Sequence, residues 1–395
     1  MSDSNYAIGD VLNVRIERIV PRGLGIAFVE GLTILVALGA PGDELTVRLT
    51  DIKKRLAFAE IVSIDNPSPL RQKPPCQYFG ECGGCDFQQL TYEAQLEAKV
   101  GIIRDSLKRI GKIDYENDIP IITSRPLEYR SRVRWQVDPQ NRRFGYYKRG
   151  SHEVIDIEQC PKLTPELNKL LGDLRGDITY DSLDEGQIAI SAISGDDNSL
   201  SVSSSLADEP ADEMTWSSGA ETYDFSAETF FQANKFLIPQ LIDAAVGGYK
   251  GGIAFDLYSG VGLFTLPLAR RFEKVLAVEE HPESSAMCKR NLENSKLDNA
   301  IPVTRSVRRF LAENRTGNID LVLLDPPRAG TEKNVIRMIA ELQPREISYV
   351  SCDPSILARD ARELLDAGYE ITDLTALDLF PQTHHVETVA RLRLL

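Results

Sequence analysis

The sequence lacks several features that would place it in common classes of protein. Its longest uncharged apolar stretch lies near residues 32–40, which is far too short to cross a membrane. It contains no Gly-x-x-x-x-Gly-Lys-Ser/Thr motif, so a P-loop nucleotide hydrolase is not indicated. It has no internal repeat of fixed period and no secretory signal, and we expect a cytoplasmic protein with reduced cysteines.

Basic residues are absent from one long part of the chain. Residues 176–234 hold 13 acidic residues and no Lys or Arg. This part nearly accounts for the formal net charge of −14 at pH 7, so the rest of the chain is almost neutral. Its centre, residues 195–219, is rich in Ser, Asp and Glu and predicts a mobile loop or linker that faces away from any polyanionic partner.

Residues 125–149 have the opposite character. They hold eight basic against two acidic residues, and five aromatic residues lie among them. The aromatic residues are Tyr129, Trp135, Phe144, Tyr146 and Tyr147. Cations that pair with phosphates and rings that stack on free bases are typical of single-stranded RNA binding. The alternative is a solvated β-meander with a core of aromatic residues, and the pattern leaves both open.

Three short motifs in the C-terminal half suit one chemistry. Asp325-Pro326-Pro327-Arg328 and Ser351-Cys352-Asp353-Pro354 each follow an apolar run, so both predict strands that end abruptly in loops. In open α/β sheets, ligands bind beyond the carboxyl ends of the strands. A thiol at Cys352 and carboxylates at Asp325 and Glu387 could there attack, orient and deprotonate one substrate.

A glycine loop in the same half predicts a cofactor site. Residues 253–257 predict a short strand that leads into Tyr258-Ser259-Gly260-Val261-Gly262 and then a helix. Glycine lets the backbone approach a ligand closely. Glu279 ends the next predicted strand, where an acidic residue suits a ribose diol. The loop departs from the full dinucleotide fingerprint and fits S-adenosylmethionine better, because that ligand has no pyrophosphate.

Together these motifs resemble those of the RNA 5-methyluridine methyltransferases of the iron–sulfur, TRAM-containing type. The matching motifs are Phe230-Phe231-Gln232-Ala233-Asn234, Asp256-Leu257-Tyr258-Ser259-Gly260-Val261-Gly262, Asp325-Pro326-Pro327-Arg328, Ser351-Cys352-Asp353-Pro354 and His385-Val386-Glu387-Thr388. The resemblance implies that Cys352 is the nucleophile, adding to C6 of uracil, and that Glu387 removes the C5 proton. It also implies that S-adenosylmethionine is bound by Gln232, Tyr258, Glu279 and Asp325.

Plainer interpretations stand beside this one. A free cysteine such as Cys352 is often a small buried hydrophobe, and an isolated Glu387 would more often be a surface carboxylate. The chain could also be a noncatalytic RNA-binding protein with an inactive methyltransferase fold, or an iron–sulfur redox protein. Intact catalytic motifs argue against the first, and methyl transfer from labelled cofactor to RNA would exclude the second.

The cysteines of the N-terminal half form a second pattern. Cys76, Cys82 and Cys85 have the spacing C-x5-C-x2-C in a glycine-rich loop, and Cys160 is followed by proline. Four thiolates could ligate an iron–sulfur cluster or a zinc ion, and the residues alone leave both open. The resemblance implies a [4Fe-4S] cluster on these four cysteines. Cys288 lies in a predicted helix, and we expect it to pack in the core.

The length of 395 residues predicts more than one domain. Residues 1–65 predict five short strands and an OB-like barrel that resembles the RNA-binding TRAM domain. Residues 66–215 predict a mainly β central domain that holds the cysteine loop and the basic segment. Within it Thr91 should cap a helix that ends at Gly111, whose apolar face carries Leu96, Val100, Ile103, Leu107 and Ile110. Residues 216–395 predict a class I methyltransferase domain with a Rossmann-like α/β sheet.

The implied substrate is a uridine in folded RNA. A duplex hides C5 and C6 from a thiol, so the target base should be unpaired or flipped out of its stack. Family members with both TRAM and iron–sulfur features suggest 23S rRNA, and the T-loop uridine of tRNA is the alternative. We expect a monomer that makes no membrane contact.

Overall fold

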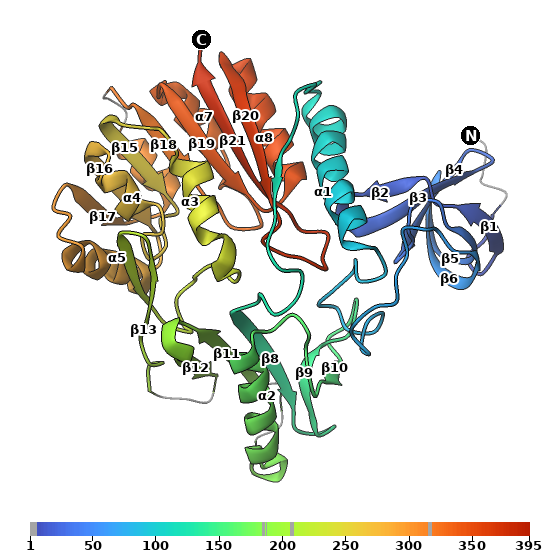
Figure 1. Cartoon of the computed structure of the whole chain (residues 1–395). Helices are drawn as coiled ribbons and strands as arrows, with labels where there is room; N and C mark the ends of the chain where they lie inside the picture. Colours follow the sequence, from blue (N-terminus) through green and yellow to red (C-terminus); the bar gives the residue numbers. More distant parts are fainter. Residues whose placement is uncertain (1–5, 184–185, 187, 206–208, 315–317) are drawn as a thin grey trace.

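The computed structural model describes residues 6–183, 186, 188–205, 209–314 and 318–395. Figure 1 shows a small lobe of strands at the N-terminus, a second group of strands in the middle of the chain, and a large α/β sheet at the C-terminus. Among the described residues, no helix combines the length and apolar character that a membrane crossing needs.

The N-terminal lobe is a six-stranded sheet in the order β1-β5-β6-β4-β3-β2. Its strands are β1 (Val11–Arg15), β2 (Arg18–Val20), β3 (Leu24–Val29), β4 (Leu32–Ala37), β5 (Glu44–Lys53) and β6 (Leu56–Asn66). Alternate side chains of β4 and β5 face inward, and Ile34, Val36 and Val47 are fully buried. The five predicted strands are present, and the short β2 is a sixth that the sequence did not indicate.

The middle of the chain forms a five-stranded sheet in the order β10-β9-β8-β11-β12, followed by a hairpin. The elements are β8 (Arg132–Asp138), β9 (Arg143–Tyr147), β10 (Val154–Asp156), α2 (Pro165–Asp177), β11 (Ile188–Ser194), β12 (Leu200–Ser204), and the hairpin strands β13 (Met214–Ser218) and β14 (Glu221–Phe225). Short 3-10 turns lie at Pro21–Gly23, Tyr180–Ser182, Asp196–Asn198 and Lys235–Leu237.

The structure decides one open question for this region and corrects one expectation. Tyr129, Trp135 and Phe144 are completely buried, so for these three residues the core alternative holds and not the stacking surface for bases. The reason is strand alternation, because Trp135 shares one face of β8 with the buried Val133 and Val137, whereas Arg134 is exposed. Residues 195–219 are not a loop, since they contain β12 and β13; residues 206–208 of that stretch lie outside the described residues.

A helix and a short strand from residues 92–122 join the C-terminal sheet. Thr91 accepts a hydrogen bond from the Ala94 amide and caps α1 (Tyr92–Ser106), as predicted. The helix widens into a π-turn, η2 (Leu107–Gly111), which leaves Ile110 45% exposed instead of on the buried face. Further on, β7 (Ile121–Ile122) pairs in parallel with β20 (Tyr369–Leu377) at the edge of the sheet.

The C-terminal sheet has eight strands in the order β17-β16-β15-β18-β19-β21-β20-β7. Its other strands are β15 (Gly251–Leu257), β16 (Phe272–Glu279), β17 (Ala300–Thr304), β18 (Leu321–Leu324), β19 (Glu346–Ser351), β20 (Tyr369–Leu377) and β21 (Glu387–Leu394). Its helices are α3 (Ile238–Val246), α4 (Thr265–Ala269), α5 (Pro282–Asn294), α6 (Val307–Glu313), α7 (Val335–Leu342) and α8 (Pro354–Asp366). The strands from β17 to β19 are parallel, and β21 is antiparallel to both β19 and β20.

Helices cover both faces of this sheet. Residues of α3, α4 and α5 share one apolar core, and residues of α1, α6, α7 and α8 share the other. Parallel strands with helices on both faces define the doubly wound arrangement that the sequence predicted. The carboxyl ends of β15, β16, β18 and β19 therefore meet at one edge, where the predicted site residues lie.

Candidate active site and cysteine-lined cavity

Cys352 lies between the end of β19 and the start of α8. Pro354 at the first helical position and the Asp353 carboxylate, which accepts from the Ser355 amide at 2.8 Å, fix the turn from strand to helix. The Ser351 hydroxyl bonds the backbone of Asp353 and tightens the same turn. Cys352 is consequently held at the carboxyl edge of the sheet, half-buried and not in a disulfide.

Glu387 is the first residue of β21, the strand beside β19. Ser351 of β19 faces Thr388 of β21. Continuing this antiparallel register by one residue brings Cys352 opposite Glu387. Glu387 is 3% exposed, and its Oε1 atom has no hydrogen-bond partner among the described residues. A buried carboxylate oxygen without a partner is free to take a proton from a bound substrate.

The electrostatics of the site couple these residues. Burial, and next the Glu387 carboxylate, raises the pKa of the Cys352 thiol to about 12, while Arg328 opposes this shift. Burial and the neighbouring Asp325 raise the pKa of Glu387 well above its ordinary value. Burial also raises the pKa of Asp325 to about 7. Two carboxylates and one thiol thus share a desolvated site with one nearby guanidinium.

Asp325 follows β18 directly, as predicted from the proline break. Its amide donates to the Leu257 carbonyl at 3.3 Å, which connects it to the end of the neighbouring strand β15. Leu257 is also the residue from which the glycine loop starts. Asp325 therefore lies between the glycine loop and Cys352, and both belong to one edge of the sheet.

The glycine loop has the conformation that its sequence suggested. Tyr258, Gly260 and Gly262 all have positive φ, at 65°, 55° and 97°. A Cβ on Gly260 would meet open space, whereas one on Gly262 would come within 2.9 Å of the Cys288 sulfur. Gly262 is thus needed for close packing, and the loop stays open to a ligand at Gly260.

Glu279 and Tyr258 are both in contact with other polar groups near this loop. The Glu279 carboxylate accepts from the Gly260 amide at 2.9 Å and from the His281 amide at 2.8 Å. The Tyr258 hydroxyl donates to Glu332, and its pKa is raised first by burial and then by that carboxylate. The two hydrogen bonds that Glu279 accepts hold it against the glycine loop.

The sequence interpretation assigned no role to Asp256, near the end of β15, or to Ser259, in the loop that follows. The Asp256 carboxylate is fully buried, and burial raises its pKa to about 7. One of its oxygens accepts from the Thr265 hydroxyl, but Oδ1 has no partner among the described residues, and neither has the Ser259 hydroxyl. Both belong to a motif recognised for its glycines. Only the fold shows that their polar atoms are buried and unpaired.

The motif at residues 230–234 places one aromatic residue outside and one amide inside. Phe230 is 61% exposed, and the Arg132 guanidinium lies 5.8 Å from the centre of its ring. Phe231 packs in the core, stacked on Phe225 with ring centroids 4.2 Å apart. Gln232 is buried, as a residue that contacts a bound cofactor would be. Phe230 is a candidate base-stacking residue that the sequence interpretation did not single out.

Four of the six cysteines line one cavity. Cys76, Cys82, Cys85 and Cys160 border a space of about 140 Å³, although Cys160 is remote in sequence. The Gly84 amide donates to the Cys82 sulfur at 3.4 Å, and Gln88 donates through Nε2 to the Cys85 sulfur at 3.0 Å. Donors of this kind stabilise thiolates that ligate metal centres.

Lys162 also borders this cavity. Its ammonium group is buried and donates to the Gly84 carbonyl at 2.6 Å. Burial raises the pKa of Cys82 to about 11, while the Gly84 amide and Lys162 act in the opposite direction. The described residues contain no group of three or more His, Cys, Asp or Glu placed to ligate a single metal ion. Cys288, in contrast, is a fully buried residue of α5 that packs under the glycine loop.

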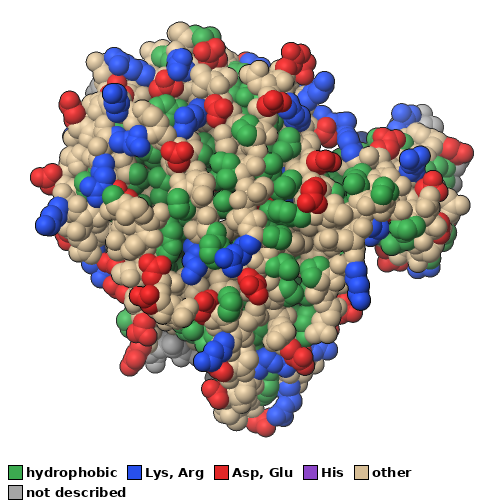
Figure 2. Space-filling view, viewed as in Figure 1, with side chains coloured by type: hydrophobic (Ala, Val, Ile, Leu, Met, Phe, Trp, Pro, Cys, Tyr) green, Lys and Arg blue, Asp and Glu red, His purple; other side chains and the backbone are tan. Residues whose placement is uncertain are grey.

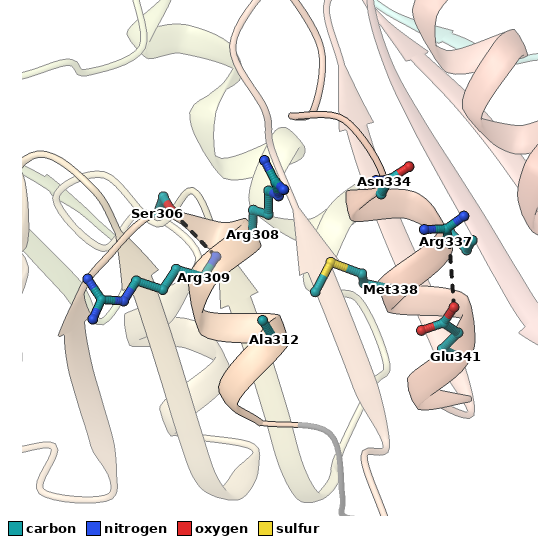
Figure 3. Close-up of a pocket in the computed structure, with 8 residues that line it drawn as sticks. All are labelled: Ser306, Arg308, Arg309, Ala312, Asn334, Arg337, Met338 and Glu341. Carbon is teal, nitrogen blue, oxygen red and sulfur yellow. Dashed lines mark hydrogen bonds and ion pairs between the residues drawn. The ribbon is translucent and has the colours of Figure 1, made fainter.

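A separate groove of about 620 Å³ lies between α6 and α7 (Figure 3). Three arginines border it: Arg308, Arg309 and Arg337. Arg309 pairs with Glu313 and Arg337 with Glu341.

On the face drawn in Figure 2, basic and acidic side chains are interspersed and form no single patch of one sign. On this face, an RNA chain would meet no continuous basic surface.

Comparisons with known proteins agree with this geometry. The tRNA (Uracil-5-)-methyltransferase family matches residues 211–393, and the TRAM domain matches residues 7–62. An RNA methyltransferase of Aquifex aeolicus described as uncharacterized is 30% identical, over 96% of this chain and 98% of its own length. The 23S rRNA (uracil(1939)-C(5))-methyltransferase RlmD of Pectobacterium atrosepticum is 31% identical, over 96% of this chain and 93% of its own.

A solved structure is similar over nearly the whole chain. The tRNA (uracil-54, C5)-methyltransferase of Pyrococcus abyssi, in complex with S-adenosyl-L-homocysteine, has a TM-score of 0.73 and 26% sequence identity. The similarity covers 96% of this chain and all of that one.

The fold and the site thus define a class I S-adenosylmethionine-dependent methyltransferase joined to an N-terminal TRAM domain. The chain belongs to the family of TRAM-containing RNA uracil-5-methyltransferases. It is an enzyme that acts on RNA, and its cofactor is S-adenosylmethionine.

Proposed function

We propose that this protein methylates C5 of a uridine in 23S rRNA through a covalent bond between Cys352 and C6 of the base. The ribosomal target is supported by several relatives named 23S rRNA (uracil(1939)-C(5))-methyltransferase RlmD, such as those of Pectobacterium atrosepticum and Vibrio parahaemolyticus. The observation that carries the mechanism is the register of β19 and β21, which pairs Ser351 with Thr388 and so brings the next residue, Cys352, near Glu387.

The first step is addition of the thiolate. Cys352 attacks C6 of the uracil ring, and the electrons of the C5–C6 double bond move toward O4, which makes C5 a nucleophile. The pKa of Cys352, about 12, means that the free enzyme holds mainly the thiol. In this proposal the thiol proton passes to solvent as the substrate binds, since Cys352 is only half-buried, and Arg328, which lowers this pKa, favours the thiolate.

Methyl transfer and elimination follow. When bound, S-adenosylmethionine supplies the electrophilic methyl group that C5 receives. Glu387 then takes the C5 proton, the C5–C6 double bond re-forms, and Cys352 leaves as the thiolate. The raised pKa of Glu387 makes its ionised form a stronger base than an ordinary carboxylate, and its unpartnered Oε1 is available for the proton.

The cofactor pocket in this proposal lies at the glycine loop. Gln232, Tyr258, Glu279 and Asp325 would hold S-adenosylmethionine. The fit is supported by the open space beside Gly260 and by the buried, unpaired oxygens of Asp256 and Ser259. Phe230 would stack on the unpaired uracil, because it is an exposed aromatic residue two positions before Gln232.

A tRNA target is the second candidate. It is favoured by the similarity, over 96% of this chain, to the tRNA (uracil-54, C5)-methyltransferase of Pyrococcus abyssi. One assay distinguishes the two candidate substrates. Unmethylated total RNA from a host that lacks 5-methyluridine is incubated with the enzyme and S-adenosylmethionine. Nucleoside mass spectrometry of the purified fractions should find 5-methyluridine in 23S rRNA. Product in tRNA alone would transfer the proposal to the second candidate.

For the four cysteines we propose a [4Fe-4S] cluster as the occupant. The shared cavity and the hydrogen bonds to the sulfurs of Cys82 and Cys85 support it. A cluster is larger than one ion, so its four thiolates need not converge on a point. It would tie the loop at residues 76–85 to Cys160 and so stabilise the middle of the chain.

Protein purified without oxygen should contain about four iron atoms per chain and absorb broadly in the visible range. Changing any one of Cys76, Cys82, Cys85 or Cys160 to Ser should lower iron content and the temperature of unfolding together. Cys288→Ala is the matched control, because its sulfur is buried in the core of the catalytic sheet, and it should keep its iron. Stoichiometric zinc without iron would overturn the cluster and leave the methyltransferase mechanism untouched.

The charges around Cys352 should be visible in its reactivity. Glu387→Gln removes a group that raises the pKa of Cys352, so alkylation by iodoacetamide at mildly alkaline pH should become faster. Arg328→Ala removes a group that lowers this pKa, so alkylation should become slower. Mass spectrometry of the peptide that contains Cys352 separates it from the other cysteines. Equal rates in both variants would contradict the proposed charge environment.

A further inference from the structure

We propose that Asp86 and His384 form a latch through which the cysteine loop positions the catalytic Glu387. The inference concerns residues 378–386, the loop between β20 and β21, which ends at Glu387. It rests on the proposed role of Glu387 and adds two positioning residues to it. Figure 1 shows this loop lying beside α1, although the two are far apart in the sequence.

The start of the β20–β21 loop is anchored to α1. Asp378 accepts hydrogen bonds from the Lys99 ammonium and, at 2.8 Å, from the Tyr92 hydroxyl. Lys99 also donates to the Phe380 carbonyl at 3.0 Å. The side chains of Lys99 and Asp378 are both 0% exposed. A buried ion pair that also satisfies a backbone carbonyl fixes this end of the loop.

The middle of the loop is held by the same helix and by the central region. Gln95 and Gln382 bond each other twice, from Nε2 of Gln95 to Oε1 of Gln382 at 3.1 Å and from the Gln382 amide to Oε1 of Gln95 at 3.0 Å. Tyr129 donates to the Pro381 carbonyl at 2.9 Å. These hydrogen bonds dock the middle of the loop against α1 and the central region.

The last part of the loop is held by the residue after Cys85. Asp86 accepts from the His384 amide at 2.7 Å through one carboxylate oxygen and contacts the His384 Nδ1 atom at 2.6 Å through the other. In return, the amides of Asp86 and Phe87 donate to the Gln382 carbonyl at 3.2 and 3.1 Å. Two backbone and two side-chain contacts thus join the cysteine loop to the β20–β21 loop.

The latch is close to the reacting groups. His385 follows it directly, with its ring 4.2 Å from that of His384. Burial, and then His384, lowers the pKa of His385 to about 3, which keeps this ring neutral beside the site. Val386 is fully buried, and Glu387 comes next. A displacement of His384 would reach Glu387 across only two residues.

Glu387 depends on its backbone for its position. Because Oε1 has no partner among the described residues, side-chain hydrogen bonds do not fix that oxygen. The pairing of β21 with β19 and β20 fixes one side of Glu387, and the β20–β21 loop fixes the other. A change of about 1 Å in a reacting group can cost about 100-fold in rate. Loosening of the cysteine loop would therefore act on proton removal more than on RNA binding.

The test is His384→Ala, assayed with unmethylated total RNA from a host that lacks 5-methyluridine. We expect kcat to fall about 10- to 100-fold while KM for RNA changes by less than about twofold. A covalent RNA adduct should accumulate on denaturing gels, because addition of Cys352 precedes the step that Glu387 performs. His384→Asn, whose amide can donate to Asp86 where Nδ1 does, should recover most of kcat. Lys289→Ala, on an exposed ion pair of α5, is the control and should behave as wild type.

The outcomes separate the latch from the mechanism. Wild-type kcat and no adduct in both His384→Ala and Asp86→Ala would overturn the latch. So would a loss of activity that matches a loss of iron and of melting temperature and that His384→Asn does not recover, because that pattern indicates a purely structural role. If the wild type itself forms no adduct with RNA that contains 5-fluorouridine, the proposed function fails instead.

Discussion

Replacing Cys352 by alanine is expected to lower methyl transfer to RNA by about 10³-fold or more. Among the described residues of the site, the Cys352 thiol is the one nucleophile in position to add to C6, and without that addition C5 remains a poor nucleophile. The substitution removes one sulfur from a half-buried position, so the fold and the binding of RNA and cofactor should be kept. Transfer of labelled methyl groups and filter binding of RNA would measure the two properties separately.

Binding is the internal control for this variant. If Cys352→Ala binds RNA and S-adenosylmethionine as the wild type does but no longer transfers methyl groups, the loss lies in the chemistry. Substantial turnover by Cys352→Ala would exclude covalent catalysis through this residue.

Glu387→Gln is expected to stall the reaction after methyl transfer. The amide is nearly isosteric with the carboxylate and cannot take the C5 proton, so turnover should fall about 10²- to 10⁴-fold. Addition of Cys352 and receipt of the methyl group remain possible, and a covalent adduct with ordinary uridine RNA should build up. Denaturing gels with labelled RNA would detect it. Normal turnover with no adduct would show that another group is the base.

The catalytic half of the fold could be predicted because its signals are local. Apolar runs that stop at Asp325 and Cys352 beside proline mark strand ends, and strand ends at one edge of a parallel sheet must lie near each other. The positive φ of Gly260 and Gly262 likewise follows from a loop that needs glycine. The sequence alone did not show that Glu387 faces Cys352, since that depends on the register of an antiparallel strand.

The surroundings of α1 could not be predicted in this way. Helical periodicity placed Ile110 on the buried face, yet it is exposed, while Gln95 and Lys99 are completely buried. Lys99 is buried against Asp378, which lies 279 residues further along the chain. A local pattern around Lys99 could not indicate so distant a partner. The helical periodicity of apolar residues indicates one apolar face of a helix. It cannot indicate that a polar face will be covered by a loop from another part of the chain.

The basic segment shows a similar limit. Basic residues that alternate with aromatic ones are typical both of an RNA-binding surface and of a strand whose rings point inward. In β8 the second arrangement is observed, because Trp135 is completely buried. The prediction of a loop in the acidic segment was wrong for another reason. Its composition suggested a loop, but Met214 and Trp216 are buried and hold β13 in the core. A few large apolar residues outweigh polar composition when they share one face of a strand.

The most direct test of the mechanism is to find where the enzyme becomes attached to its substrate. RNA in which 5-fluorouridine replaces uridine has no C5 proton to lose, so the adduct formed after methyl transfer cannot eliminate. After incubation with S-adenosylmethionine, digestion and mass spectrometry should identify one modified peptide, with a methylated fluorouridine on Cys352. An adduct on any other residue would contradict the proposed mechanism. So would the absence of any adduct when the enzyme does methylate the same RNA made with ordinary uridine.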